Sequence, residues 1–365
     1  MSNGSRLAVL FAGLLVGMVL GCGSPKPAAY VGEANLARRA QSAGDHQRAG
    51  RHYERAATLA VQQRDADELR YLAADSYVRA GSLAAAATLH GQLARGAASG
   101  ERRARSDFAL ARLKLREGDE ADGHVQLAGA IRRHPESGLA SRAVSEHLDY
   151  LRAAGGAARA LSFLDAERQW LSGTSLAETL DYLRARELEQ AGRMLEARDA
   201  YLACAARFPY PAGAYWDDAL FHAAEAELRL GAPRRALAHL ERLLREQETA
   251  SIVGSYQRAR YAEGQLKLAE IYRDQLHDKP RARRELRKVW DRHPKSRLVD
   301  DALFEEALLA RSEGDQAGAC APLRIILKER KDSRYAPCAH ALCAEIAELE
   351  GRACHDYVKR RAGID

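Results

Sequence analysis

Residues 185–209 read ARELEQAGRMLEARDAYLACAARFP, and they hold the pattern that decides the fold. Gly192 lies between two stretches with helical apolar spacing, and a glycine there supplies the left-handed turn that ends a helix. Ala185 precedes it by seven residues and Ala197 follows by five, so small side chains occupy both stretches close to the turn. The second stretch carries apolar residues at i, i+3, i+4 and i+7, namely Tyr201, Cys204, Ala205 and Phe208. These residues predict a helix, a glycine turn and a second helix.

The same pattern recurs along the chain. The first five turn positions are each 37 residues apart, the next two intervals are 39 and 46, and the last two are 37 again: Gly44, Gly81, Gly118, Gly155, Gly192, Gly231, the turn-like His277, Gly314 and Gly351. A small or apolar residue precedes the turn by seven positions at Ala37, Ala74, Ala111, Leu148, Ala185, Ala224, Ala307 and Ala344. A small residue follows by five at Ala49, Ala86, Gly123, Ala160, Ala197, Ala236 and Ala319. A period of roughly 20 to 50 residues indicates stacked copies of one supersecondary unit.

Prolines end several of the second helices, in RHPES (133–137), RHPKS (292–296) and at Pro209. Taken together, these features resemble the tetratricopeptide repeat (TPR), although the interval of 37 residues exceeds that family's usual value of about 34. The resemblance implies an all-α, TPR-type α-solenoid of about nine helix-turn-helix repeats over residues 33–361. The copies near 147–151 and 276–278 are degenerate and predict a bend or insertion, and residues 247–255 predict a longer loop. An irregular helical bundle without repeats is the alternative.

The N-terminus predicts export and lipid attachment. Arg6 precedes an apolar run from Leu7 to Leu20, which has the length of a secretory signal core and is short for a membrane span. The run ends in Val19-Leu20-Gly21-Cys22, which resembles the lipobox of bacterial lipoproteins. That resemblance implies a signal peptide over residues 1–21, a lipid-bearing Cys22 and a tether over residues 22–32. Gly23 follows the cysteine in place of aspartate, which by resemblance to the enterobacterial sorting rule favours the periplasmic side of the outer membrane. An uncleaved anchor or an ordinary secretory signal is the alternative.

The net charge of +6 does not by itself point to nucleic acid, because the charges are spread along the chain and no stacking aromatics are interleaved with them. One segment, 279–297, is concentrated, with nine Lys or Arg against two acidic residues. It is a candidate surface for anionic lipid, peptidoglycan or an acidic protein, with a solvated helix face as the alternative. The candidate residues in this segment are Lys279, Arg281, Arg283, Arg284, Arg287 and Lys288.

Four cysteines gather in the last repeats. Cys320 and Cys343 are placed on successive antiparallel helices at similar height, and an oxidising compartment would allow a disulfide there, with buried free thiols as the alternative. A metal site built from Cys338, His340, Cys343, Cys354 and His355 has poor zinc spacing, because Cys338 and Cys343 are on different faces of a helix. We therefore predict no metal site.

No catalytic motif is present in the sequence, which has no phosphate-binding glycine loop, no nucleophile elbow and no His-Glu-x-x-His. The acidic pairs 217–218, 300–301 and 305–306 fit helix starts, where they favour the positive end of the helix dipole. Trp170, Trp216 and Trp290 fit packing between helices. The sequence thus predicts no enzyme activity and no cofactor.

The function predicted is a non-enzymatic scaffold for protein–protein interaction that assists a cell-envelope complex. The arrangement resembles lipoproteins that assist β-barrel assembly, pilus secretin assembly or Tol–Pal coordination. Its partners would bind in the concave groove of the solenoid, with Tyr77 and Tyr272 contributing, and the membrane would hold Cys22. The alternative function is a peptidoglycan-associated regulator or adaptor of a cell-wall enzyme. Nucleic acid is not a predicted partner.

Overall fold

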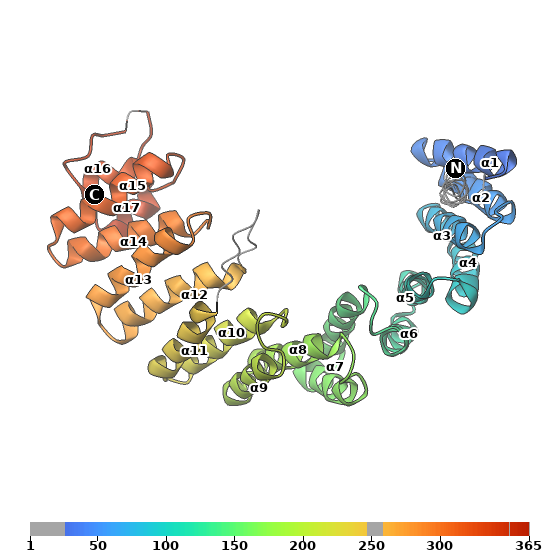
Figure 1. Cartoon of the computed structure of the whole chain (residues 1–365), viewed down its shortest axis with the longest axis horizontal. Helices are drawn as coiled ribbons and strands as arrows, with labels where there is room; N and C mark the ends of the chain where they lie inside the picture. The colour runs from blue at the N-terminus through green and yellow to red at the C-terminus, as the bar shows by residue number, and fades with distance from the viewer. Residues whose placement is uncertain (1–25, 247–257, 350, 365) are drawn as a thin grey trace, which may run out of the picture. The chain divides into compact units, whose positions relative to one another are not determined.

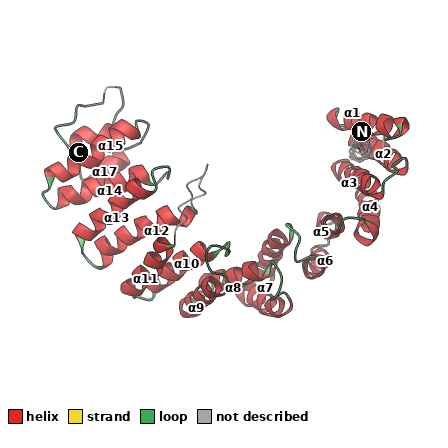
Figure 2. Ribbon diagram, in the orientation of Figure 1, coloured by secondary structure: helices red, strands yellow, loops and turns green. Residues whose placement is uncertain are grey.

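The computed structural model describes residues 26–246, 258–349 and 351–364, and every regular element in these ranges is a helix (Figure 2). The signal peptide, Cys22 and the loop at 247–255 that the sequence predicts lie outside the described residues. The chain divides into two compact units, Met1–Tyr150 and Leu151–Asp365. The boundary falls in the degenerate copy near residues 147–151.

The first unit is a run of antiparallel helix pairs in which each of the first six helices packs on its neighbour in sequence (Figure 1). Its helices are α1 (Ala28–Ser42), α2 (His46–Thr58), α3 (Gln63–Arg79), α4 (Leu83–Gly96), α5 (Gly100–Arg116), α6 (Glu120–Arg133) and the first part of α7 (Ala140–Trp170). Helix α1 begins inside the segment predicted to be a tether. Tyr30 explains this, because its side chain packs into the core with Ala34 and Ala37.

The second unit continues the same construction (Figure 1). After the rest of α7 come α8 (Ala177–Gln190), α9 (Met194–Arg207), α10 (Trp216–Arg229), α11 (Pro233–Arg245), α12 (Ala259–Glu270), the π-helical turn η1 (Ile271–Gln275), α13 (Lys279–Arg292), α14 (Val299–Ser312) and α15 (Gln316–Glu329). It ends in the 3-10 turn η2 (Ala336–Cys338), α16 (Ala339–Leu342) and α17 (Asp356–Ala362). The fold is all-α and of the solenoid type that the repeats predict.

The turns form where the sequence places them, with one exception. A positive φ occurs at Gly44, Gly81, Gly118, Gly192, Gly231, Gly314 and Gly351, and at His277 with φ 53°. In the fourth repeat Gly155 is extended, with φ −166°, and Gly156 takes the left-handed turn with φ 68°. The prediction of Gly155 was wrong by one residue, because two consecutive glycines satisfy the same requirement and the sequence does not choose between them.

Small residues on both helices form the core of each pair. Ala37, Ala74, Ala185 and Ala224 before the turns, and Ala49, Ala86, Ala197, Ala236 and Ala319 after them, are all 0% exposed. The ninth repeat takes a different form. Ala344, which was expected in a helix, is exposed and lies in a turn, and α16 has only four residues.

The tryptophans and acidic pairs differ from expectation at two points. Trp216 is fully buried and Trp290 packs against the core, but Trp170 is 77% exposed at the end of α7, so its prediction as a packing residue was wrong. Residues 217–218 and 300–301 lie in the first turns of α10 and α14. Residues 305–306 lie in the middle of α14, where Glu306 pairs with Arg287 of the preceding helix.

Among the described helices, none combines the length and the apolar character needed to cross a membrane.

Gly81→Ala should lower the free energy of unfolding of the first unit by about 1–2 kcal/mol, because an L residue is strained at a left-handed φ. Gly32→Ala is the matched control. At both positions an added methyl group meets nothing within 4 Å, and only Gly81 has a positive φ. The control lies within α1 and should stabilise by about 0.5–1 kcal/mol. Urea unfolding of both variants checks this, and equal effects would contradict the assignment of the turn.

Candidate binding site

A cavity of about 230 Å³ opens between α12 and α14, the first helices of two successive pairs. Leu266 and Ala269 of α12 and Leu286 of α13 supply apolar lining. Glu270, Arg273, Asp301 and Glu305 supply charge, and Arg361 of α17 closes one side. Charged side chains outnumber apolar ones in this lining, so the cavity offers a small apolar floor and several placed groups that can form ion pairs with a bound segment.

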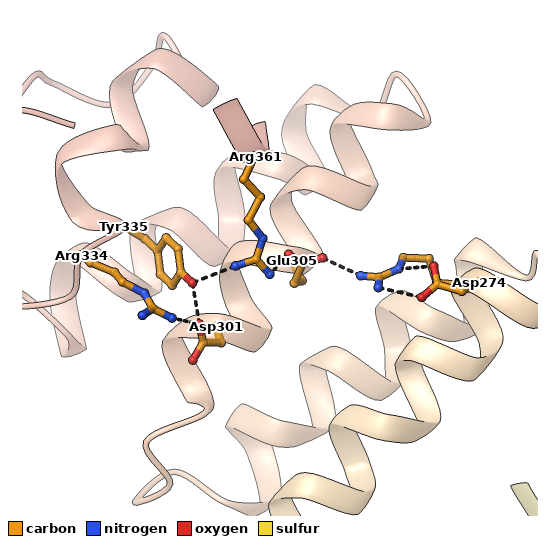
Figure 3. Close-up of polar contacts among 7 residues, drawn as sticks. Asp274, Asp301, Glu305, Arg334, Tyr335 and Arg361 are labelled. Atoms are coloured by element: carbon orange, nitrogen blue, oxygen red, sulfur yellow. Dashed lines mark hydrogen bonds and ion pairs between the residues drawn. The ribbon is translucent and has the colours of Figure 1, made fainter. Parts of the chain in front are cut away.

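Glu305 is the centre of the charges in this cavity. Its Oε2 accepts a hydrogen bond from Arg273 Nη1 at 2.6 Å, and its Oε1 accepts from Arg361 Nη2. Arg273 also donates to both oxygens of Asp274, at 2.7 and 2.9 Å. Figure 3 shows Arg361 extending from α17 between Glu305 and Tyr335. Glu305 thus joins η1, α14 and α17 through two guanidinium groups.

Tyr335 forms the second half of this network. Its ring is fully buried and stacks on Phe304 with the centroids 4.1 Å apart. Its hydroxyl donates to Asp301 Oδ1 and accepts from Arg361 Nη1 at 3.1 Å (Figure 3). Burial, together with the hydrogen bond to Asp301, raises the pKa of Tyr335 to about 12, so the phenol keeps its proton at neutral pH. The group positions its neighbours rather than exchanging protons with them.

The helix α17 is itself a short segment bound to the first-helix side of the second unit. Val358 is its buried anchor, with no exposed surface, and it belongs to the same core cluster as Phe304 and Leu303. Arg361 supplies the polar contact. A seven-residue helix has too few internal hydrogen bonds to be stable alone, so these contacts determine where α17 lies.

The four clustered cysteines form two disulfides. Cys320 of α15 is joined to Cys343, the pair weighed from the sequence, with Cα atoms 5.3 Å apart. Cys338 is joined to Cys354, a pairing that was not predicted from the sequence. The arrangement considered there, with Cys338, Cys343 and Cys354 as metal ligands beside His340 and His355, does not exist, since the thiols are consumed. His340 instead lies against the carbonyl oxygen of Ile346, with Nδ1 at 2.6 Å.

The predicted basic surface is largely neutralised. Arg283 pairs with Glu313 and Asp315, at 3.1 and 2.7 Å, and Arg287 forms a two-pronged pair with Glu306. Lys288 pairs with Glu285, Arg281 with Asp278, and Lys279 donates to Ser312. Arg284 is exposed. Apart from Glu285, which lies on α13 itself, the acidic partners come from the next pair of helices and from the turn before α13, which a count over residues 279–297 does not include.

The two tyrosines assigned to a groove have different environments. Tyr77 is buried in the core of the first unit, where its hydroxyl donates to Glu54, so it offers no open surface. Tyr272 lines a cavity of about 260 Å³ between α11, α12 and α13, together with Gln265 and Lys288. Tyr335, Glu305 and Arg361 were missed. The only signal in the sequence is that Asp301 and Arg334 are separated by about one repeat.

A family model of the tetratricopeptide repeat matches residues 218–247 and 263–296. These ranges fall on the pairs α10–α11 and α12–α13. The fold is a TPR-type solenoid. A search of the curated proteins finds no sequence match.

Solved structures of similar proteins have low sequence identity to this chain. A tetratricopeptide repeat protein from Parabacteroides merdae is 14% identical, with 76% of this chain and 98% of that chain covered and a TM-score of 0.34. The C-terminal part of a TPR repeat-containing protein from Cytophaga hutchinsonii is 12% identical, with 74% and 98% covered and a TM-score of 0.44. The protein pilF of Pseudomonas aeruginosa is 16% identical, with 68% and 100% covered and a TM-score of 0.40.

Replacing Cys338 and Cys354 together by alanine should loosen α17, because that disulfide closes a loop of 16 residues just before the helix begins. Removing a disulfide that closes a loop of this size lowers the free energy of unfolding by about 3 kcal/mol. Hydrogen exchange followed by mass spectrometry should show faster exchange in residues 356–362. The control is the corresponding double variant of Cys320 and Cys343, which should affect α15 more than α17. Unchanged exchange in α17 would mean that Val358 and Arg361 hold it without the disulfide.

Proposed function

We propose that this protein is a non-enzymatic scaffold that binds other proteins through the first helices of its repeats. The observation that carries the proposal is the site between α12 and α14, which already holds a helical segment of the chain's own. The apolar anchor Val358 and the ion pair between Arg361 and Glu305 are the kinds of contact by which a helix from another protein binds a groove. Stacked repeats extend such a surface over many helices.

We further propose that the scaffold acts in the bacterial cell envelope, held on the periplasmic side of the outer membrane by lipid on Cys22. The lipobox-like sequence before Cys22 supports the anchor. The two disulfides support an oxidising compartment, because disulfides are rare in the reducing cytosol. The partner is then an envelope protein whose assembly or coordination the scaffold assists. Four of the nine basic side chains in residues 279–297 pair with acidic groups, which lowers the free positive charge that the alternative of a peptidoglycan adaptor would use.

Cys22→Ala should abolish incorporation of labelled fatty acid and release the protein from the membrane fraction, because the acyl chains attach through that thiol. Cys204→Ala is the matched control and should keep the label. Cys204 is the buried free cysteine among the described residues, and burial raises its pKa to about 12, so it stays an unreactive thiol. Labelling that persists in the Cys22 variant would contradict the lipid anchor.

A photo-crosslinking residue in place of Glu270, on α12 beside the cavity, should capture a partner protein in intact cells. The same residue in place of Lys328, which is 82% exposed on the second helix α15, is the control and should capture little. The crosslinked bands are compared by gel and identified by mass spectrometry. Equal capture at both positions would contradict binding through the first helices.

A further inference from the structure

Three side chains from two helices of the second unit come together away from the cavity described above. Glu189 lies on α8, and His222 and Glu225 lie three residues apart on α10. His222 Nδ1 is 3.1 Å from Glu225 Oε2 and 3.8 Å from Glu189 Oε2. Ligand atoms bound to one metal ion at about 2.0–2.2 Å are separated by about this much. All three atoms lie within 4.8 Å of one another.

His222 is the nitrogen ligand of the candidate site. Its Nδ1 is buried and lies in a short ion pair with Glu225, and for its Nε2 no hydrogen-bond partner is found among the described residues. The ring stacks on Tyr201 with centroids 5.4 Å apart, which fixes its orientation. A metal ion between Nδ1 and the two carboxylates would replace the ion pair with coordination bonds.

The carboxylate of Glu189 is held in place by a donor on the next helix. Tyr201, on α9, donates its hydroxyl proton to Glu189 Oε2 at 2.7 Å, and Arg229 lies 3.4 Å from the other oxygen. Metal-binding carboxylates are commonly hydrogen-bonded in this way, which orients them toward the ion.

We infer that Glu189, His222 and Glu225 form a binding site for a divalent transition-metal ion. One imidazole nitrogen and two carboxylate oxygens suit Zn²⁺ or its neighbours better than Mg²⁺ or Ca²⁺, which take oxygen ligands throughout. The two carboxylates offset the charge of the ion, and Arg186, Arg229 and Lys267 are cations near them. Three protein ligands leave a coordination position open, and water reaches it because the Glu225 side chain is 29% exposed.

The site was not predicted from the sequence, and the spacing explains why. His222 and Glu225 form a short motif on one helix, but Glu189 is 33 residues earlier, on the corresponding helix of the preceding pair. Only the stacking of α8 and α10 through α9 brings the ligands together.

The test uses the full chain, purified without a polyhistidine tag and freed of metal with a chelator. Equilibrium dialysis and calorimetry with Zn²⁺ should show one ion bound per chain. Co²⁺ in its place should give visible absorption bands of a low-coordinate site, and Mg²⁺ should not compete. Absence of stoichiometric Zn²⁺ binding would overturn the inference.

Glu225→Gln and His222→Ala should each weaken Zn²⁺ affinity at least about tenfold, because even the loss of a group supporting a ligand costs that much. His239→Ala is the matched control. His239 is a second half-buried histidine of this unit with an unpartnered Nε2, and it faces the single carboxylate of Glu227 at 3.9 Å. Circular dichroism of the metal-free variants checks that each is folded. Equal affinity in the Glu225→Gln variant and in the control would place the ion elsewhere.

Discussion

The close approach of the two helices in each pair is the constraint on which the rest of the structure depends. Alanines on both sides of the turns at Gly44, Gly81, Gly192 and Gly231 are wholly buried. At Gly123 even a methyl group would lie 2.5 Å from Leu115 of the paired helix, and at Gly50 it would lie 2.5 Å from the Tyr77 ring of the next pair. Interiors are packed too densely to absorb such an addition. The pair spacing therefore determines the stacking of repeats, and the stacking determines which charges on successive helices can meet.

The periodic part of the fold could be predicted because its requirements are local. A left-handed turn needs glycine, and a close helix contact needs a small side chain. Glycines and small residues therefore recur at a fixed interval in the sequence. The prediction failed where the requirement was met twice, at Gly155 and Gly156. It also failed in the last repeat, where α16 and α17 replace a regular helix pair. Disulfides hold that region, and a sequence of cysteines does not specify their pairing.

The candidate sites were hard to predict because their residues meet only through the stack. Arg273 and Glu305 are 32 residues apart, and Arg361 is a further 56 along the chain. Each side chain looks like an ordinary solvated charge in the sequence. The same effect misled the interpretation of residues 279–297, since Glu306, Glu313 and Asp315 of the following helix pair supply the neutralising charge. Charge patterns within one helix are therefore a poor guide to the surface of a repeat protein.

The C-terminal end of the stack shows how a binding surface can depend on oxidation. A terminal repeat must cover the apolar face that its neighbour would otherwise bury. Here Val358 covers part of the core over Phe304, but the helix that carries it has only seven residues. The disulfide between Cys338 and Cys354 restricts the segment just before that helix, so Arg361 is kept near Glu305. In a reducing compartment the same segment would lose this restraint, and the charge of Glu305 would be balanced by Arg273 alone. The stability of this end of the site therefore depends on whether the protein is in a compartment where the disulfides form.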